Sequence, residues 1–423
     1  MPNAAYIAPN FKLPVMIRSF LLLVFLGVIV NKPVGQIFYK YDNTVYNAVF
    51  LNEAFKLMAA NPDHLLLDVR SPGEYADTSA ATALNIGRFK GAVNINISDV
   101  PAHIDELKKY IDKPVFVYCS HSQRSRRVSK LLVENGFKKV YNINGGMSLV
   151  NESDSRSFTD KYKVLETNTN YKNIASTEAI QLITGNPELL IIDIRTENEF
   201  NSKDSIQRNN IGRLKNAINI PQDVFKDRIA SMNLSSGRPV LLYDLQGHNS
   251  MDVVDILRAK GFTQVYNLFE GLVAFACDNK LNPDLRKKLL ENAPGYQFLN
   301  PRGCIDLLTK SPGTLVLDTR PFNDFENKAS RDYMNLGRIK GAIHVGAVDS
   351  LPAAIQQLNK TAPILVYGGS ENTGVAVSNE LLKKGFTNVY YLYEGLYRFV
   401  WATANIEDCK EGRQLLANHE GLY

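Results

Sequence analysis

Three copies of one set of motifs organise this chain of 423 residues. An apolar run that ends in Asp-x-Arg recurs at a constant spacing of 125 residues, with its aspartate at Asp68, Asp193 and Asp318. A Gly-Arg-x-Lys segment recurs with the same spacing and begins at Gly87, Gly212 and Gly337. This period is far longer than that of a solenoid repeat. Each copy is therefore expected to fold as a domain with its own core.

Short apolar runs alternate with helical patterns inside each copy. In the first copy we expect helices over 51–60, around 104–110 and over 126–134. We expect strands in the run that ends in Asp68-Val69-Arg70, at 92–95, from Pro114 to an end at Cys119, and at 140–143. Buried strands that alternate with helices favour a parallel sheet covered by helices on both faces. The predicted fold class is α/β, with three tandem domains of this kind. Ligands of such sheets bind beyond the carboxyl ends of the strands, where residues 119–125 fall.

Polar linkers separate the copies at 151–173 and 278–297. The predicted domains are 44–155, 170–277 and 295–405, followed by a C-terminal helical tail at 406–423. The second linker and the tail contain similar charged, leucine-rich segments. We therefore expect an extra helix after copies two and three that copy one lacks.

The stretch of the chain that could meet a membrane lies near its beginning. Lys12 and Arg18 precede an apolar run of eleven residues, 20–30. This run is shorter than the roughly 20 residues of a transmembrane helix and is typical of a secretory signal. We expect a signal peptide over 1–35, cleavage near Gln36, and a periplasmic mature protein without a membrane span. An uncleaved anchor or a buried N-terminal helix is the alternative.

Charge and cysteine content argue against several classes of function. The net charge of +5 is spread over the whole length, so no nucleic-acid partner is expected. Four cysteines are too few and too scattered for a disulfide scaffold or a zinc site. No metal or other cofactor is expected. Cys277, Cys304 and Cys409 are expected to be small buried thiols, although one pair could form a disulfide in an oxidising compartment.

The strongest candidate for a catalytic segment lies at 118–125, with the sequence Tyr-Cys-Ser-His-Ser-Gln-Arg-Ser. Cys119 ends a predicted buried strand, and a turn of six residues leads from it into a helix. The backbone N–H groups of such a turn and the positive end of the helix stabilise an anion. We therefore expect Cys119 to form a thiolate and to act as the nucleophile. Arg124 suits a bidentate grip on an oxyanion such as thiosulfate.

The Asp-x-Arg strand, the Gly-Arg-x-Lys turn, the pair Cys119 and Arg124, and the Gly-Phe-x-x-Val-Tyr ending at Gly136 together resemble the rhodanese (thiosulfate sulfurtransferase) family. The resemblance covers all three copies. It implies that Cys119 carries sulfane sulfur as a persulfide, from a small sulfur-containing anion to a thiol acceptor that is a small molecule or a protein. It further implies a substrate cradle formed by Ser120, His121, Ser122, Gln123 and Ser125.

Two departures from the family pattern concern the first copy. Arg88 stands where family members usually have a histidine. Glu74 stands where the two-domain thiosulfate enzymes tend to have an arginine, which argues against thiosulfate as the natural donor. Because all three copies keep a version of Asp68, Arg70 and Glu74, we expect these residues to form a structural network of ion pairs and turns.

The loops of the other two copies have lost the cysteine. Asp244 and Gly368 stand at the position of Cys119, so neither loop can form a persulfide. Asn249 and Thr373 replace the loop arginine. The net charge of residues 113–139 in the first copy is +6, whereas the equivalent windows of the other copies balance to zero. The first copy alone is therefore predicted to have a positively charged entrance to its loop, which attracts anions.

These observations favour an exported sulfurtransferase with one active domain. The alternative is a non-catalytic binding or scaffold protein in which Cys119 is vestigial, since a shared fold does not guarantee activity. A cysteine phosphatase has the same nucleophile and cradle. Related tyrosine phosphatases, however, have five residues between the cysteine and the arginine, and the shorter loop here argues against phosphatase activity.

Overall fold

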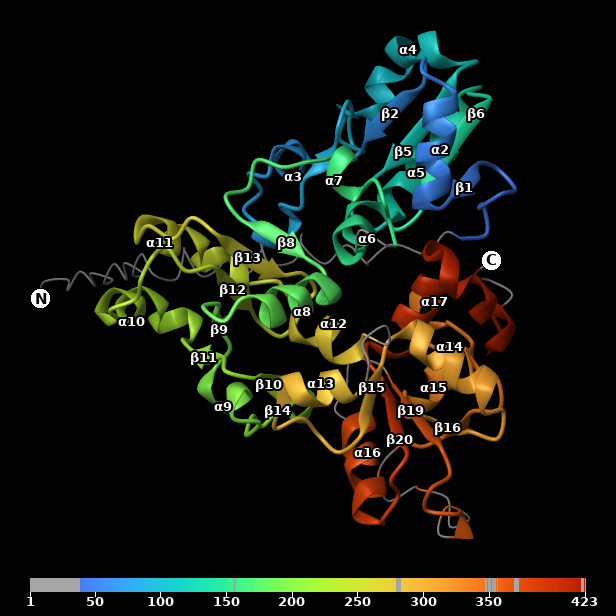
Figure 1. Cartoon of the computed structure of the whole chain (residues 1–423). Coiled ribbons are helices and arrows are strands. Elements are labelled where there is room, and N and C mark those ends of the chain that lie inside the picture. Colours follow the sequence, from blue (N-terminus) through green and yellow to red (C-terminus); the bar gives the residue numbers. More distant parts are fainter. Residues whose placement is uncertain are drawn as a thin grey trace, which may run out of the picture. The chain divides into compact units, whose positions relative to one another are not determined.

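A computed structural model describes residues 39–154, 157–278, 283–346, 348, 351, 355, 357–368, 373–419 and 422 (Figure 1). These residues belong to one compact unit, 38–423, and the predicted signal peptide at 1–35 lies outside the described residues. No helix in the described part of the chain has both the length and the apolar character needed to cross a membrane.

The first repeat contains a five-stranded parallel sheet with the strand order β1-β6-β5-β2-β4. Its strands are β1 (Asn47–Val49), β2 (Leu65–Asp68), β4 (Val93–Asn94), β5 (Pro114–Tyr118) and β6 (Lys139–Ile143). Its helices are α2 (Leu51–Ala60), α3 (Pro72–Ala76), α4 (Ile104–Leu107), α5 (Gln123–Glu134) and α6 (Gly146–Glu152). The long crossovers between neighbouring strands are what a parallel sheet requires.

The second and third repeats have the same strand order, β8-β13-β12-β9-β11 and β15-β20-β19-β16-β18 (Figure 1). The second contains β8 (Lys172–Ile174), β9 (Leu190–Asp193), β11 (Ile218–Asn219), β12 (Val240–Tyr243), β13 (Val265–Leu268), α8 (Ser176–Gly185), α9 (Glu197–Phe200), α10 (Phe225–Ser231), α11 (Val254–Ala259) and α12 (Gly271–Cys277). The third contains β15 (Gln297–Leu299), β16 (Leu315–Asp318), β18 (Ile343–His344), β19 (Ile364–Tyr367), β20 (Val389–Leu392), α14 (Pro301–Lys310), α15 (Phe322–Phe325), α16 (Thr373–Lys383) and α17 (Gly395–Asn405).

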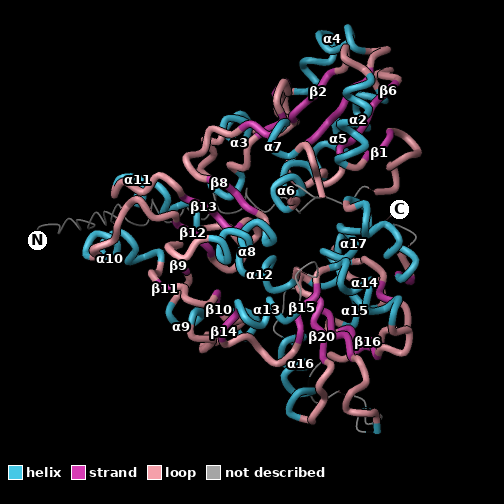
Figure 2. The backbone as a smooth tube through the Cα atoms, viewed as in Figure 1, coloured by secondary structure: helices cyan, strands magenta, loops and turns pink. Residues whose placement is uncertain are grey.

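The sheet of the first repeat is buried on both faces, because successive residues of a strand point to opposite sides. Phe116 packs in a cluster with Ala54 of α2 and Met147 of α6. Its neighbour Val117 packs in a second cluster with Leu132 of α5. All five residues are fully buried. The predicted α/β fold with helices on both faces of each sheet is therefore confirmed (Figure 2).

A pair of short antiparallel strands closes each repeat outside its main sheet. The pairs are β3 (Arg88–Phe89) with β7 (Leu165–Glu166), β10 (Arg213–Leu214) with β14 (Leu290–Glu291), and β17 (Arg338–Ile339) with β21 (Leu416–Ala417). A helix precedes β7 after the first repeat as well, α7 (Lys161–Val164), just as α13 (Pro283–Leu289) precedes β14. The prediction that copy one lacks this helix is wrong. The sequence does not reveal α7, because one turn of helix is too short to show a helical period.

The C-terminal tail is not helical throughout. A 3₁₀ helix at Glu407–Leu415 leads into β21, which is the outer strand of the third closing pair. The tail therefore belongs to the third repeat in the same way as each linker belongs to the repeat before it.

The glycine of each Gly-Arg-x-Lys segment is required by these closing pairs. Gly87 has a φ of +75°, and a Cβ at this position would lie 2.7 Å from the carbonyl oxygen of Glu166. The next residue, Arg88, forms an ion pair of 2.6 Å with the side chain of Glu166. This contact explains the arginine that departs from the family pattern.

Candidate active site

Cys119 directly follows β5, and only 1% of its surface is exposed. The start of α6 packs against its backbone, since the amides of Met147 and Ser148 donate to the carbonyl oxygens of Cys119 and Ser120 at 3.0 Å each. Gly146 permits this approach, because it has a φ of +55° and a Cβ there would lie 2.1 Å from the oxygen of Cys119. The strand and α6 together therefore fix the backbone of the predicted nucleophile.

The turn after Cys119 is shorter than predicted. α5 begins at Gln123 instead of 126, and Ser122 precedes the helix with a φ of 69°. The hydroxyl of Ser122 donates to the carbonyl oxygen of Ile143 at 3.0 Å, which ties the turn to β6. Apolar periodicity could not locate this start, because the first turn of α5 is polar. Arg124 is consequently the second residue of α5.

The equivalent loop of the second repeat shows what the backbone of such a turn binds. The carboxylate of Asp244, at the position of Cys119, accepts hydrogen bonds from four amides of its own loop. These amides belong to Gln246, Gly247, Asn249 and Ser250. The corresponding amides of the first repeat belong to His121, Ser122, Arg124 and Ser125, and they have no acceptor in the described part of the chain. The first loop therefore offers backbone donors to an anion at Cys119.

Arg124 is already held by a carboxylate. Its Nη1 and Nη2 donate to the Glu74 carboxylate at 2.7 and 2.6 Å, and Nη2 also donates to the hydroxyl of Ser120 at 3.0 Å. Burial raises the pKa of Glu74, but the hydrogen bonds and charge of Arg124 and the hydrogen bonds of Ser71 outweigh burial and lower it to about 2. Arg124, the predicted binding group for an oxyanion, is thus paired with a carboxylate that stays negatively charged near neutral pH. Sequence alone does not indicate this pair, because its members come from different elements.

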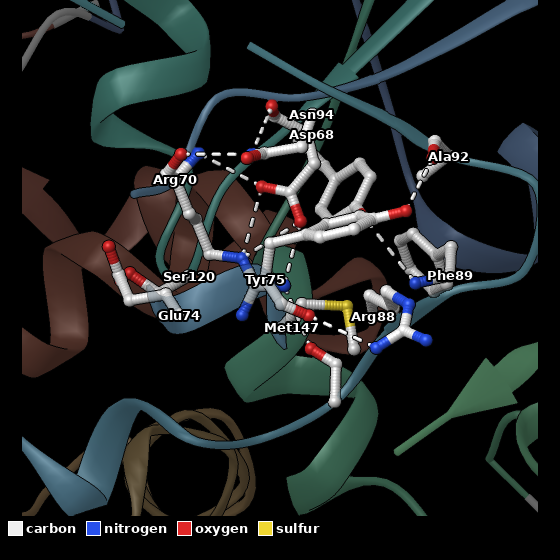
Figure 3. A network of polar contacts seen from close by, with 12 residues as sticks. Asp68, Arg70, Glu74, Tyr75, Arg88, Phe89, Ala92, Asn94, Ser120 and Met147 are labelled. Atoms are coloured by element: carbon white, nitrogen blue, oxygen red, sulfur yellow. Dashed lines mark hydrogen bonds and ion pairs between the residues drawn. The ribbon is translucent and has the colours of Figure 1, made fainter. Parts of the chain in front are cut away.

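Asp68 and Arg70 form the predicted structural ion pair beside this site (Figure 3). Both side chains are fully buried, 2.7 Å apart, and Arg70 also donates to the carbonyl oxygen of Gly87 at 2.8 Å. Equivalent buried pairs at 2.6 Å occur at Asp193–Arg195 and Asp318–Arg320. This part of the predicted network is confirmed in all three repeats. It joins the end of β2 to the Gly-Arg-x-Lys turn and carries no feature particular to the first repeat.

His121 joins two hydroxyl groups. Its Nδ1 lies 3.0 Å from the Ser120 hydroxyl, and its Nε2 lies 2.9 Å from the Ser148 hydroxyl. Burial by surrounding segments and the positive charges of Arg398 and Arg124 lower the pKa of His121 to about 4, although part of the residue remains exposed. The ring is therefore neutral near neutral pH and adds no positive charge to the site. Its contacts connect the loop with α6.

The remaining cradle residues, Ser125 and Gln123, differ in whether their side-chain polar groups have hydrogen-bond partners. Ser125 is fully buried, and its hydroxyl donates to Oδ1 of Asn142 at 2.6 Å. The side-chain amide of Gln123 has neither donor nor acceptor within the described residues, although both of its polar atoms are shielded from solvent. Such unsatisfied polar groups are uncommon. Gln123 is therefore the cradle side chain with free hydrogen-bonding capacity.

Carboxylates from elsewhere in the sequence offset the positive charge around the loop. Arg126 is fully buried and pairs with Asp42 at 2.9 Å. Lys138 pairs with Asp112 at 2.7 Å. Together with the pairing of Arg124, these contacts reduce the attraction for anions that the local charge of +6 predicted. A window of sequence cannot show charges that the fold brings in from outside it.

The third repeat has filled the position of the cysteine differently. A Cβ at Gly368 would lie 2.5 Å from the hydroxyl oxygen of Thr319, which donates to the carbonyl oxygen of Tyr367 at 3.1 Å. Residues 369–372 of this loop lie outside the described part of the chain. A threonine hydroxyl thus occupies the space that a cysteine side chain would need.

The other three cysteines are buried, unpaired thiols. Burial raises the pKa of Cys277 and Cys304 far above the usual range, and it raises the pKa of Cys409 to about 12. Such thiols remain protonated and are poor nucleophiles. They lie on α12, on α14 and in the 3₁₀ helix of the tail, away from any loop of the predicted type.

A model of the family described as Rhodanese-like domain matches residues 51–153, 176–277 and 304–401 of the chain. The three matched segments fall on the three repeats. Together they account for more than half of the sequence.

Curated relatives match single segments of the chain. The tRNA uridine(34) hydroxylase of Cytophaga hutchinsonii is 38% identical over 96 residues, which is 22% of this chain and 28% of that protein. The uncharacterized protein YqhL of Bacillus subtilis is 37% identical over 81 residues, which is 19% of this chain and 56% of that protein. The chain thus spans less than two thirds of each relative.

Two solved structures are similar at a low level. The thiosulfate sulfurtransferase of Pseudomonas aeruginosa is 15% identical, with 82% of this chain and 66% of that one covered and a TM-score of 0.23. The Alr3790 protein of Anabaena sp. is 26% identical, with 24% and 73% covered and a TM-score of 0.20.

Proposed function

Because the chain belongs to the rhodanese-like family, we propose that it is a sulfurtransferase that carries sulfane sulfur on Cys119. The donor is a small sulfur-containing compound, and the acceptor is a thiol, either free or on a protein. The first repeat carries the activity, because Asp244 and Gly368 replace the cysteine in the other two. We further propose export to the periplasm, on the basis of the N-terminal apolar run at 20–30.

The observation that carries this proposal is the set of four backbone amides within the loop, which point to the position of Cys119 or of its equivalent. In the second repeat such a set binds the carboxylate of Asp244, so the turn is an anion receptor. In the first repeat the same place holds Cys119, whose thiolate and persulfide forms are both anions. Backbone donors that are fixed before the reaction stabilise such charge without reorganisation. The loop therefore supports a cysteine that alternates between these two forms.

The transfer proceeds in two displacements. The thiolate of Cys119 attacks the outer sulfur of the donor, an S–S bond forms, and the bond from that sulfur to the rest of the donor breaks with both electrons on the leaving group. With thiosulfate the leaving group is sulfite, and with a persulfide it is a thiolate. The acceptor thiolate then attacks the outer sulfur of the Cys119 persulfide. This step releases the sulfur as a new persulfide and regenerates the Cys119 thiolate.

The pairing of Arg124 with Glu74 bears on the choice of donor. Thiosulfate carries two negative charges, and the carboxylate of Glu74 lies 2.6 Å from the guanidinium that would bind them. A like charge at this distance from a binding group weakens binding of an anion. The site is therefore better suited to a thiol-bound sulfur donor than to a dianion.

The experiment that tests this proposal measures sulfur transfer with two donors, thiosulfate and glutathione persulfide, to a common thiol acceptor. The wild-type protein should turn over both, with higher kcat/KM for the persulfide. The variant Cys119→Ser should turn over neither, whereas Cys304→Ser, in the third repeat, should resemble the wild type. Absence of transfer by the wild type with both donors would favour a non-catalytic binding or scaffold protein.

A further inference from the structure

The last helix of the third repeat, α17, contacts the loop that carries Cys119. Nε1 of Trp401 donates a hydrogen bond to the carbonyl oxygen of His121 at 3.3 Å. Trp401 is 3% exposed, and the guanidinium of Arg398 lies 4.2 Å from the centre of its ring. The tryptophan therefore holds the backbone two residues after the predicted nucleophile.

Asn405, at the end of α17, contacts α5 and the residue before α6, the two segments next to the same loop. It is fully buried, and its Oδ1 accepts hydrogen bonds from Nη1 of Arg126 at 3.0 Å and from the amide of Gly145 at 3.2 Å. Its Nδ2 donates to the carbonyl oxygen of Trp401 at 2.8 Å. The Asn405 side chain is thus tied to the backbone of α17 at Trp401 as well as to the first repeat.

The two groups that Asn405 binds belong to α5 and to the start of α6, the two segments that contact or continue the Cys119 loop. Gly145 precedes α6, whose first amides bind the carbonyl oxygens of Cys119 and Ser120. Arg126 lies in the first turn of α5 and donates to Oδ1 of Asn144 at 3.0 Å. A shift of Asn405 would therefore move both segments that frame the nucleophile.

These α17 side chains are not part of the pattern that the repeats share. When α12 and α17 are aligned on their first residues, Gly271 and Gly395, the second repeat has Ala274 and Cys277 where the third has Arg398 and Trp401. The third repeat therefore carries groups of its own at the surface that meets the first. A guanidinium, an indole N–H and a carboxamide are costly to bury unless each finds a partner.

We propose that Trp401 and Asn405 of the third repeat are positioning residues of the active site in the first repeat. This inference rests on the proposed function of Cys119. The third repeat, which has no cysteine loop of its own, completes the support of the loop that has one. The chemistry is then a property of the assembled chain and not of the first repeat alone.

The test compares Trp401→Phe and Asn405→Ala with Thr403→Val. Thr403 is a buried residue of the same helix whose hydroxyl donates to Val400 within α17, at 2.8 Å. Trp401→Phe keeps a ring beside Arg398 and removes the indole N–H. Two rates are measured on the full chain, the alkylation of Cys119 by iodoacetamide near neutral pH and the kcat of sulfur transfer, together with KM and the thermal unfolding midpoint.

Loss of one neutral hydrogen bond corresponds to about a two- to tenfold effect on an equilibrium or rate. We expect alkylation and kcat to fall by about this factor in Trp401→Phe, and by more in Asn405→Ala, while KM changes little and Thr403→Val keeps wild-type values. Wild-type alkylation rates in Trp401→Phe, or an equal loss in Thr403→Val, would overturn the inference. Alkylation needs no sulfur donor, so it decides this point even if the proposed sulfur transfer is absent.

Discussion

The guanidinium of Arg124 makes two hydrogen bonds, at 2.6 and 2.7 Å, with the carboxylate of Glu74, which lies 50 residues earlier in the chain. Glu74 is 3% exposed and also caps α3 through Ser71. The one cationic group of the loop is therefore tied to an anion from another element. This pair sets both the stability of the loop and the charge that a donor meets.

Glu74→Gln should increase the use of thiosulfate. The substitution removes a negative charge close to the loop while keeping the shape of the side chain, so kcat/KM for the dianion should rise by about tenfold. The value for glutathione persulfide should change less, because that donor carries less negative charge at the reacting end. The measurement is the ratio of the two efficiencies in the variant and the wild type.

The second repeat offers a matched control for this change. Glu199 occupies the same place and caps α9 through Thr196 in the same way. Glu199→Gln should therefore leave the ratio of efficiencies as in the wild type. A lower thiosulfate efficiency in Glu74→Gln would mean that Glu74 assists donor binding, and our interpretation of the pair would be wrong.

Arg124→Ala should destabilise the protein. It removes the main partner of the buried Glu74 carboxylate, and breaking a buried ion pair in this way costs about 3 kcal/mol. Arg124→Lys should recover only part of the loss, because an ammonium group cannot reproduce the paired hydrogen bonds. Urea unfolding measures the effect. The double variant Glu74→Gln/Arg124→Ala should be more stable than Arg124→Ala alone, and the opposite order would refute the account of the pair.

Gly146→Ala should abolish sulfur transfer. A Cβ at Gly146 would lie 2.1 Å from the carbonyl oxygen of Cys119, and the φ of +55° is unfavourable for alanine. Either the start of α6 or the loop must move. Gly91→Ala is the matched control, since Gly91 also has a positive φ but no atom within 4 Å of the added Cβ. Equal activity of the two variants would show that contact between α6 and Cys119 is dispensable.

Glu270→Gln should stabilise the protein in a pH-dependent way. Burial and the carboxylate of Glu152, joined by Glu394, raise the pKa of Glu270 despite the nearby Arg398. An acid whose pKa is raised by folding holds its proton in the folded state, so stability falls as pH rises above the unfolded value of about 4.3. The gain in unfolding midpoint from Glu270→Gln should therefore be absent below about pH 4 and grow toward neutral pH. A gain that is independent of pH would contradict this explanation.

Much of the fold could be predicted because the repeats show it three times. The strand that ends at Asp68 and the helix over 51–60 follow from apolar patterns that sequence displays directly. The start of α5 at Gln123 could not be found in this way, since its position depends on the turn at Ser122. The one-turn helix α7 could not be predicted, because four residues are too few for a periodic signal.

The candidate site also has a part that sequence predicts and a part that it does not. Cys119 and its loop are adjacent in sequence, so their motif could be identified there. The partners that modify the loop come from distant elements, Glu74 on α3, Asp42 before β1 and Asn405 on α17. A single sequence gives no sign of such pairings, because each partner is an ordinary polar residue until the fold brings it to the loop.

The most direct test of the central claim is the mass of the peptide that contains Cys119, after the intact protein has been incubated with a sulfur donor. The protein should have the substitutions Cys277→Ser, Cys304→Ser and Cys409→Ser, so that Cys119 is the one remaining cysteine of the four. We expect a gain of about 32 Da, the mass of one sulfur atom, which is lost again on addition of a thiol acceptor. An unchanged mass with both thiosulfate and glutathione persulfide would contradict the claim that this residue carries sulfur.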